Sequence, residues 1–374
     1  MKSRVLLFSA FVGALTCVSA WAGQEPRADA QHGPSLGTVY TESNGTAGNA
    51  VLLFDQLPDG RLVPAGQVPT GGRGTGAGLG NQGALALTRN ERWLLAVNAG
   101  SNSLSVFEVQ RHGLRLTAVQ PTGGVQPISV TEHRGIVYVV HAGSDSITGF
   151  RLSGDGRLRP IDGSERPLSG TGVGPAQIAF TLDGDALVVT EKNTNRIVTF
   201  EIDRDGRPGD VHVNDASGVT PFGFAFGRRD QLFVAEAFGG AADASAASSY
   251  HVERDGVSPV SPSVGTGQTS ACWAVVTPNG RYLYVTNTGS GSVTGYRIDF
   301  DGTIERLDAD GRTGVTGDGS TPNDVIVTDG GQYLYTLNSI SHTIGAFRVR
   351  FDGSLTALPF TPGLPVGVSG LASR

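Results

Sequence analysis

Seven polar residues stand at equivalent places along the chain, each closing a short apolar run with the composition of a β-strand. They are Glu42, Asn98, His141, Glu191, Glu236, Asn287 and Asn338. Carboxylates and an imidazole that share one site can exchange protons with a substrate. We therefore predict Glu191 or Glu236 as a general base, His141 as a general acid, and the asparagines as groups that orient a carbonyl.

Three further polar residues, Gln82, Gln177 and Asn323, lie at or just before the start of the strand that precedes such a run. In an antiparallel pair the first strand begins on the face where the second one ends. Both sets of residues are therefore expected at one face of the molecule. We predict that the substrate-binding residues are these three together with Asn98, Asn287 and Asn338.

The same carboxylates also suit a metal ion. Glu42, Glu191 and Glu236, with asparagine carbonyl oxygens beside them, offer the oxygen ligands that calcium prefers. Another divalent metal held there would activate water. For the asparagines themselves turn formation is the simpler interpretation, because asparagine tolerates left-handed backbone and caps turns with its side chain. Glutamate and histidine lack that preference, so they carry more of the functional prediction.

The elements that would position these residues recur along the chain. An Xaa-Gly pair appears seven times, at Asp59-Gly60, His112-Gly113, Asp155-Gly156, Asp205-Gly206, Asp255-Gly256, Asp301-Gly302 and Asp352-Gly353. An aromatic residue recurs with it, as Phe54, Phe107, Phe150, Phe200, Tyr250, Tyr296 and Phe347. Units of roughly 40–50 residues with four short strands are typical of a β-propeller. We therefore predict an all-β fold, a seven-bladed propeller with four antiparallel strands in each blade.

The two ends of the repeat predict how the ring closes. The first unit has no innermost strand before Thr38, whereas the chain finishes with Gly367–Ala372, which resembles the openings of other units. The C-terminal strand is therefore expected to complete blade one, and closure would remove the free sheet edges. Residues 36–374 form one predicted domain, and such a closed ring is expected to be a monomer.

The N-terminal residues predict export from the cytoplasm. Residues 1–22 combine basic Lys2 and Arg4 with an apolar core and an Ala20-Trp21-Ala22 cleavage site, as in a signal peptide, and residues 23–35 are a polar, flexible lead-in. A secreted or periplasmic protein with no membrane span after cleavage follows. Cys272 would then be the one cysteine left, and we predict that it is a buried structural residue.

Charge and motifs exclude some functions. The formal net charge is −6, and −8 without Lys2 and Arg4, so nucleic acid is not an expected partner. Lys192 is the single lysine beyond residue 22. Residues 78–83 fit the dinucleotide-binding pattern G-x-G-x-x-G, but a strand is predicted to follow them where that motif needs a helix, so we interpret the match as coincidence.

Two stretches resemble a known family. Tyr284-Val285-Thr286-Asn287 matches a tetrapeptide typical of one class of propeller repeats, and residues 174–202 (GPAQIAFTLDGDALVVTEKNTNRIVTFEI) are similar to the central motif of the bacterial lactonases. That family consists of seven-bladed propellers and includes 6-phosphogluconolactonase and muconate-lactonizing cyclases. The resemblance covers nearly all of residues 36–374 and implies this fold and a lactone substrate. Glu191 aligns with a family glutamate, whereas Ala176-Gln177 replaces the family's Arg-His pair.

Two functions follow from these observations. The first is a secreted or periplasmic enzyme that hydrolyses or isomerises a lactone or related small ester at the polar mouth of the central channel. A phosphorylated sugar fits less well, because the seven strand-end positions include no arginine or lysine. The alternative is a non-catalytic propeller that binds a protein, glycan or cell-surface component, with Phe222 and Phe238 as exposed aromatic contacts.

Overall fold

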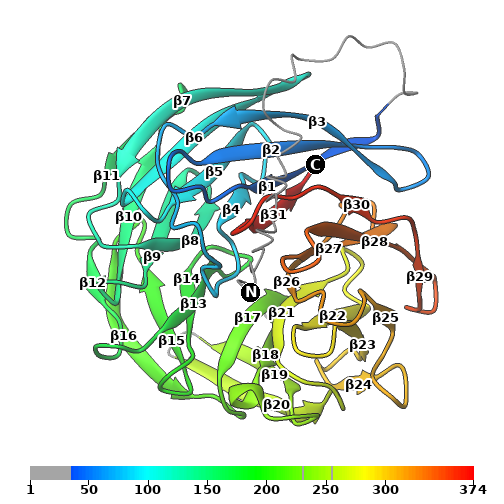
Figure 1. Ribbon diagram of the computed structural model, residues 1–374. Coiled ribbons are helices and arrows are strands. Elements are labelled where there is room, and N and C mark those ends of the chain that lie inside the picture. Colours follow the sequence, from blue (N-terminus) through cyan, green and yellow to red (C-terminus); the bar gives the residue numbers. More distant parts are fainter. Residues whose placement is uncertain (1–34, 230, 254–255) are drawn as a thin grey trace, which may run out of the picture.

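The computed structural model describes residues 35–229, 231–253 and 256–374, which form seven antiparallel sheets arranged as blades around an axis (Figure 1). The predicted signal peptide, residues 23–34 and Asp255 lie outside the described residues. Within the described residues, no helix is long and apolar enough to cross a membrane. The prediction of a seven-bladed propeller is confirmed.

From the axis outward, the strands of blades two to four follow the order of the chain, whereas in blade one the C-terminal strand β31 is innermost. Blade one contains β31 (Ser369–Ser373), β1 (Gly37–Glu42), β2 (Ala50–Gln56) and β3 (Leu62–Pro69). Blade two contains β4 (Leu85–Leu87), β5 (Trp93–Asn98), β6 (Ser103–Gln110) and β7 (Gly113–Pro121). Blade three contains β8 (Pro127–His133), β9 (Ile136–His141), β10 (Ser146–Leu152), β11 (Leu158–Pro160) and β12 (Arg166–Pro167). Blade four contains β13 (Pro175–Phe180), β14 (Ala186–Glu191), β15 (Arg196–Ile202) and β16 (Pro208–Asp215).

The other three blades have the same plan. Blade five contains β17 (Pro221–Phe226), β18 (Gln231–Glu236), the short 3₁₀ turn η1 (Phe238–Gly240), β19 (Ala246–Glu253) and β20 (Gly256–Gly265). Blade six contains β21 (Ala271–Val276), β22 (Tyr282–Asn287), β23 (Ser292–Ile298), β24 (Ile304–Arg306) and β25 (Gly314–Val315). Blade seven contains β26 (Pro322–Val327), β27 (Tyr333–Asn338), β28 (Thr343–Val349), β29 (Leu355–Ala357) and β30 (Thr361–Pro362). In blades three, six and seven the outermost strand is split into two short pieces that both pair with the third strand.

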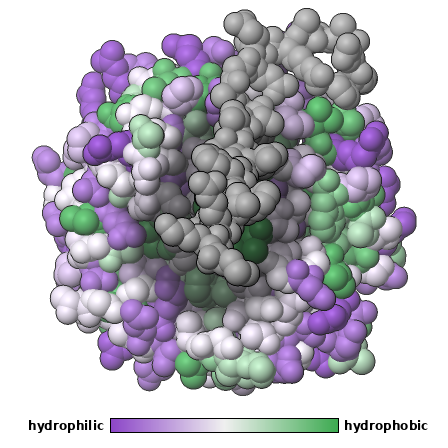
Figure 2. All heavy atoms as spheres, in the orientation of Figure 1, coloured by the Kyte–Doolittle hydropathy of each residue, from purple (hydrophilic) through white to green (hydrophobic). Residues whose placement is uncertain are grey.

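The hydrophobic core lies between the blades. Each neighbouring pair of blades shares one cluster of buried side chains. The seven recurring aromatics of the third strands are at most 1% exposed and contribute to these clusters. Burying a side chain of that size stabilises the fold by about 1.5–3 kcal/mol. Figure 2 shows hydrophilic side chains around the rim of the viewed face and hydrophobic ones at the bottom of the hollow near the axis.

The recurring Xaa-Gly turns join each blade to its neighbour. Gly60 and Gly353 have φ of 88° and 86°, a left-handed conformation that glycine adopts without strain. The tyrosine hydroxyls of the preceding blade donate hydrogen bonds to these glycines, from Tyr335 to the carbonyl of Gly60 and from Tyr284 to that of Gly353, both at 2.8 Å. At Gly60 and Gly353 glycine is therefore required by the backbone and by the close approach of a tyrosine ring.

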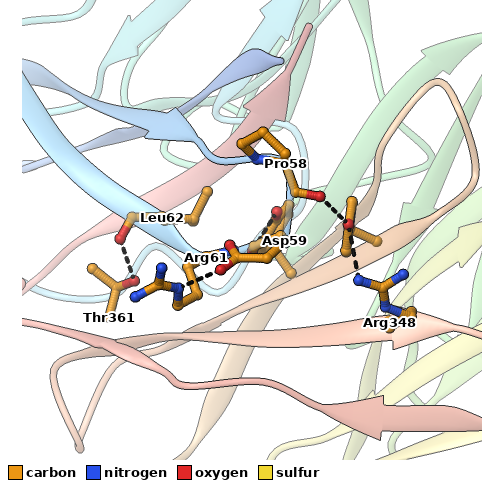
Figure 3. Close-up of polar contacts among 9 residues, drawn as sticks. Pro58, Asp59, Arg61, Leu62, Arg348 and Thr361 are labelled. Atoms are coloured by element: carbon orange, nitrogen blue, oxygen red, sulfur yellow. Dashed lines mark hydrogen bonds and ion pairs between the residues drawn. The ribbon is translucent and has the colours of Figure 1, made fainter. Parts of the chain in front are cut away.

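The predicted ring closure is confirmed, because β31 pairs with β1 and places Ala372 opposite Tyr40. Figure 3 shows the contacts on the outer side of the same seam. The Tyr333 hydroxyl donates to the Pro58 carbonyl at 2.8 Å, and Thr361 donates to the Leu62 carbonyl at 3.1 Å. The first and last blades are thus joined by a shared sheet and by hydrogen bonds between sheets.

Candidate functional site

The seven strand-end residues occupy the predicted positions but are not open to the channel. Each closes the second strand of its blade, and all seven are 0% exposed. We expected them to form a polar ring at the channel mouth. The structure instead buries their side chains within the blades, where a substrate in the channel has no access to them.

The asparagines make the turn contacts that their chemistry predicts. Asn287 Nδ2 donates to Ser292 Oγ at 3.1 Å and to Thr294 Oγ1 at 2.9 Å, on the strand that follows. Asn98 makes the equivalent contacts with Ser103 and Ser105. Such bonds satisfy groups at the end of one strand and the start of the next. Asn98 and Asn287 therefore join strands within their own blades, and Asn338 does the same through Thr343 at 3.0 Å.

Glu191 and Glu236, at the equivalent strand ends of blades four and five, are also held by hydrogen bonds. Glu191 accepts hydrogen bonds from the Ser169 backbone N–H at 3.0 Å, the Ser169 hydroxyl and the Thr194 hydroxyl at 2.7 Å. Glu236 accepts from the hydroxyls of Ser248 and Ser263. The catalytic role of these residues stays a prediction, and their burial and hydrogen bonding do not support it.

Burial changes the acidity of three of these residues. It raises the pKa of Glu42 and of Glu236 above the ordinary glutamate range. It lowers the pKa of His141 to about 4, and the His141 Nδ1 atom contacts the Ser146 carbonyl at 3.2 Å. His141 is therefore neutral near pH 7, with the Nδ1 proton donated to that carbonyl.

The three predicted metal ligands are not brought together. Glu42, Glu191 and Glu236 belong to blades one, four and five. Within the described ranges, no group of three or more His, Cys, Asp or Glu is placed to hold a metal ion. The calcium prediction therefore has no site assembled from these carboxylates, and Glu42 Oε2 instead accepts a hydrogen bond from Asn49 at 3.0 Å.

We expect His141→Asn to fold and to lose less stability in acid than the wild type. Asparagine already occupies this position in blades two, six and seven. In the unfolded chain histidine binds a proton below about pH 6.5, whereas the folded pKa is about 4. Between these values the unfolded state binds more protons, so the free energy of unfolding falls as pH falls, by up to about 1.4 kcal/mol for each pH unit. Urea unfolding near pH 7 and near pH 5 measures it, and equal losses in both proteins would contradict the assignment.

The inner strands are joined by a ring of side-chain oxygens. The backbone N–H of Ile178 donates to Ser129 Oγ at 3.2 Å, and that of Phe224 donates to Gln177 Oε1 at 2.7 Å. The N–H of Leu371 donates in the same way to Asp324 Oδ2 at 2.8 Å. Each oxygen satisfies a backbone donor that the inner edge of a blade would leave unpaired. The predicted binding residue Gln177 is thus held in a structural contact.

Blade five has no side-chain oxygen at this position to accept a hydrogen bond from the backbone of blade six. Gln82, which reaches across the axis, supplies that oxygen instead. The residue at the equivalent position of blade five is Gly223, and a Cβ atom there would overlap Gln82 Oε1. Gln82 Oε1 accepts from the Ala274 backbone N–H at 3.1 Å, and its Nε2 donates to the Ala274 carbonyl at 2.8 Å. The side chain of Gln82, from blade two, therefore pairs with blade six like a short piece of β-strand.

Residues 80–82 consequently cross the axis of the propeller. The Trp273 indole N–H donates to the Asn81 carbonyl at 2.6 Å, and the Gln82 N–H donates to the Ala176 carbonyl at 3.0 Å. Contacts with blades one, three, four, five and six hold this short segment. The G-x-G-x-x-G match is followed by strand β4 instead of a helix, as expected.

Lys192 brings a charged group to this place. Its Nζ donates to the Gly80 carbonyl at 2.6 Å and to the Pro175 carbonyl at 2.9 Å, and lies 4.8 Å from the centroid of the Phe222 ring. Burial lowers the pKa of Lys192 to about 8. The side chain remains half-buried, so part of it stays open to solvent. We call Lys192, Phe222, Cys272, Trp273 and residues 80–82 the axial cluster.

The rest of the axial cluster is mostly apolar. Phe222 is 9% exposed and its ring lies 5.1 Å from that of Trp273, so the expectation that Phe222 is an exposed contact is wrong. Cys272 is buried as predicted, and burial raises the pKa of its thiol to about 11. Asn323 is the second residue of the adjacent inner strand β26 and is half-buried, and its Oδ1 is buried and accepts no hydrogen bond from the described residues. Gln82, Asn323 and Lys192 are thus the polar residues here that are not fully buried.

Sequence reasoning missed Lys192 as a site residue, although the repeat contained a signal. Lys192 directly follows a strand-end residue, and its backbone N–H donates to Gly174 at 3.0 Å, a contact repeated in blades three, five, six and seven. The six equivalent residues are all small: Ser43, Ala99, Ala142, Ala237, Thr288 and Ser339. An alignment of the seven repeats therefore shows from the sequence alone that Lys192 is the one long, charged residue at a position otherwise occupied by small residues.

The sequence is similar to a known protein family and to one of its characterised types of protein. The family model described as "Lactonase, 7-bladed beta-propeller" matches residues 47–168 and 241–369. A 6-phosphogluconolactonase of Yersinia enterocolitica is 22% identical over 334 residues, which cover 87% of this chain and 82% of that protein.

Solved structures show the same architecture. A protein from Lactobacillus plantarum superposes with a TM-score of 0.73 at 14% identity, covering 91% of this chain and 100% of the other. A candidate 6-phosphogluconolactonase from Bacteroides fragilis gives a TM-score of 0.71 at 17% identity, covering 91% and 99%. At these identities the likeness shows a shared fold.

Proposed function

This chain belongs to the family of seven-bladed β-propeller lactonases, and we propose that it hydrolyses a small lactone at the axial cluster. The observation that carries the proposal is Lys192, an ammonium group held at the axis in a half-buried, largely apolar setting. A cation in such surroundings stabilises developing negative charge more strongly than it does in water.

The chemistry assigned to Lys192 follows from its hydrogen bonds. Two of its three N–H groups donate to the Gly80 and Pro175 carbonyls, which fix the ammonium in place. The third is left to donate to the carbonyl oxygen of a lactone. Attack by water, which releases one proton to the solvent, turns that oxygen into an oxyanion, which the ammonium stabilises. Collapse breaks the ring C–O bond, and with a pKa of about 8 the same ammonium gives its proton to the departing alkoxide and regains one from the solvent.

Two neighbours suit substrate binding. Asn323 is only half-buried, so part of it is left to contact a substrate, and the ring of Phe222 offers an apolar surface beside the ammonium. Gln82 shares its amide with Ala274 and so positions the segment that crosses the axis. Asn323 is therefore the predicted binding residue that keeps a direct role in this proposal, while Gln82 acts through the segment.

We propose a substrate that carries no phosphate. Lys192 is the single cation among the second residues of the inner strands and the residues that follow the strand ends. Phosphate sites in proteins usually combine several charged donors, often arginine forks. The N-terminal residues further support export from the cytoplasm, the closed ring supports a monomer, and the net charge of −6 argues against nucleic acid as a partner.

The test is turnover of a panel of lactones by the purified protein, followed by titration of the acid released. We expect measurable hydrolysis of an unphosphorylated aldonolactone, with a kcat/KM at least about tenfold above that for 6-phosphogluconolactone, since one unpaired charged contact is worth about 1.4 kcal/mol or more. Preference for the phosphorylated lactone would overturn the substrate assignment, and no turnover of any lactone would overturn the enzyme.

One observation favours the second candidate, a non-catalytic binding propeller. All three residues first predicted as acid and base are fully buried, and the two glutamates have their carboxylates occupied by hydroxyl donors. A silent lactone panel together with a protein or glycan captured by the intact chain would favour this candidate. A non-catalytic binding propeller, however, would not explain why Lys192 lies at the axis.

A further inference from the structure

A second polar cavity lies far from the axial cluster, between blades three and four. It has a volume of about 330 Å³ and opens beside the Xaa-Gly turns. Arg151, Arg159 and Asp162 line it from blade three, and Asp205 and Arg207 from blade four. The lactonase proposal uses none of these residues. With three arginines and two aspartates, the cavity carries an excess of one positive charge in a protein whose net charge is −6.

Two of the arginines face each other directly across neighbouring strands of blade three. Arg151 on β10 stands directly opposite Arg159 on β11. Like charges in directly opposite positions destabilise a sheet. The same position, one residue after the recurring aromatic, joins opposite charges in blades two and six, as the ion pairs Glu108–Arg115 and Arg297–Glu305. Blade three therefore keeps an unfavourable pair where blades two and six hold a salt bridge.

Backbone carbonyls hold Arg151 and Arg207 in place, and of these two only Arg207 is also paired with a carboxylate. Arg151 Nη2 donates to the Asp205 carbonyl at 3.0 Å, and Arg207 Nε donates to the Asp162 carbonyl at 3.1 Å. Carbonyls are neutral, so these bonds orient the guanidinium groups and leave their charge in place. Arg207 also pairs with the Asp205 carboxylate at 3.0 Å. Among the residues that the structure describes, the side chain of Arg159 has no hydrogen-bond or ion-pair partner, although its strand β11 pairs with β10.

We propose that this cavity binds a tetrahedral oxyanion, either inorganic phosphate or the phosphate group of a small phosphomonoester. Guanidinium forks match such oxygens with two parallel hydrogen bonds. An anion between Arg151 and Arg159 would replace their repulsion with two attractions, which explains why this blade keeps the pair. Arg207, fixed by the neighbouring blade, supplies the third donor group.

Titration calorimetry with inorganic phosphate and with glucose 6-phosphate, at low ionic strength, tests the proposal. Wild-type protein should bind at least one of them saturably, and Arg159→Gln should weaken binding about tenfold, as expected for the loss of a charged contact. The matched control is Arg157→Gln, in the same turn but outside the cavity, where Arg157 pairs with Asp155. It should change affinity by less than about twofold, because exposed pairs contribute little. Tighter binding of the sugar phosphate would identify a phosphomonoester, and equal affinity would identify phosphate itself.

A second variant separates binding from folding. Arg159→Glu recreates the opposite-charge pair of blades two and six, so its melting temperature without phosphate should equal or exceed that of the wild type. Phosphate should raise the melting temperature of the wild type and leave that of Arg159→Glu unchanged. Absence of saturable binding to the wild type, or equal loss of affinity in Arg157→Gln and Arg159→Gln, would overturn the proposal.

Discussion

Lys192→Met should lower kcat/KM for lactone hydrolysis by about 10²-fold to 10³-fold, the effect of removing one preorganised donor to an oxyanion. Methionine has a similar length and can cover the Phe222 ring, but it cannot donate to the Gly80 and Pro175 carbonyls or to a substrate. The loss should appear mainly in kcat, because the charge on the carbonyl oxygen develops in the transition state.

Two controls separate chemistry from folding in this experiment. Lys192→Arg keeps the charge and should retain more activity than Lys192→Met, although its planar fork fits the two carbonyls less well. Thermal melts should show that both variants fold. If Lys192→Met folds and hydrolyses the lactone at the wild-type rate, Lys192 is not the catalytic residue.

Gly60→Ala should lower the free energy of unfolding by about 2–5 kcal/mol, adding the cost of left-handed backbone to that of an overpacked core. Gly60 has φ of 88°, and a Cβ atom there would overlap the Tyr333 ring and lie 2.8 Å from Leu358. The substitution thus pushes blade seven away from blade one at the seam where the ring closes (Figure 3). Urea unfolding followed by tryptophan fluorescence measures the change.

Gly113→Ala is the matched control for the seam variant. Gly113 occupies the equivalent turn of blade two with φ of 108°, and a Cβ atom there would meet nothing within 4 Å. It should cost only about 1–2 kcal/mol, for the backbone alone. Equal losses in the two variants would show that the contact with Tyr333 contributes nothing to ring closure.

The architecture was predictable because its signals are local and repeated. One Xaa-Gly turn and one third-strand aromatic are needed in every blade, so seven copies appear in the sequence at intervals of similar length. For the same reason, the last residue of the second strand of each blade could be identified from the sequence. Closure by β31 could be predicted because the first repeat has no innermost strand and the C-terminus has one extra strand.

The chemistry of the centre was less predictable, because it depends on contacts between distant blades. Gln82 meets Ala274 only because Gly223 leaves room, and no local pattern connects these three residues. The side chain of a strand-end residue such as Glu191 turns back to its own blade, which apolar-polar alternation does not reveal. Lys192 was visible as one lysine among small residues, but its direction toward the axis required coordinates.

The most direct measurement uses the scarcity of lysine in the chain, whose lysines are Lys2 and Lys192. Labelling lysine with carbon-13 at Cε gives an NMR signal that Lys192→Met assigns by its disappearance. The account predicts a titration midpoint near pH 8 for Lys192 and a shift of the signal when an aldonate product is added. A midpoint at the ordinary lysine value of about 10.4, with no response to product, would contradict a substrate site at the axial cluster.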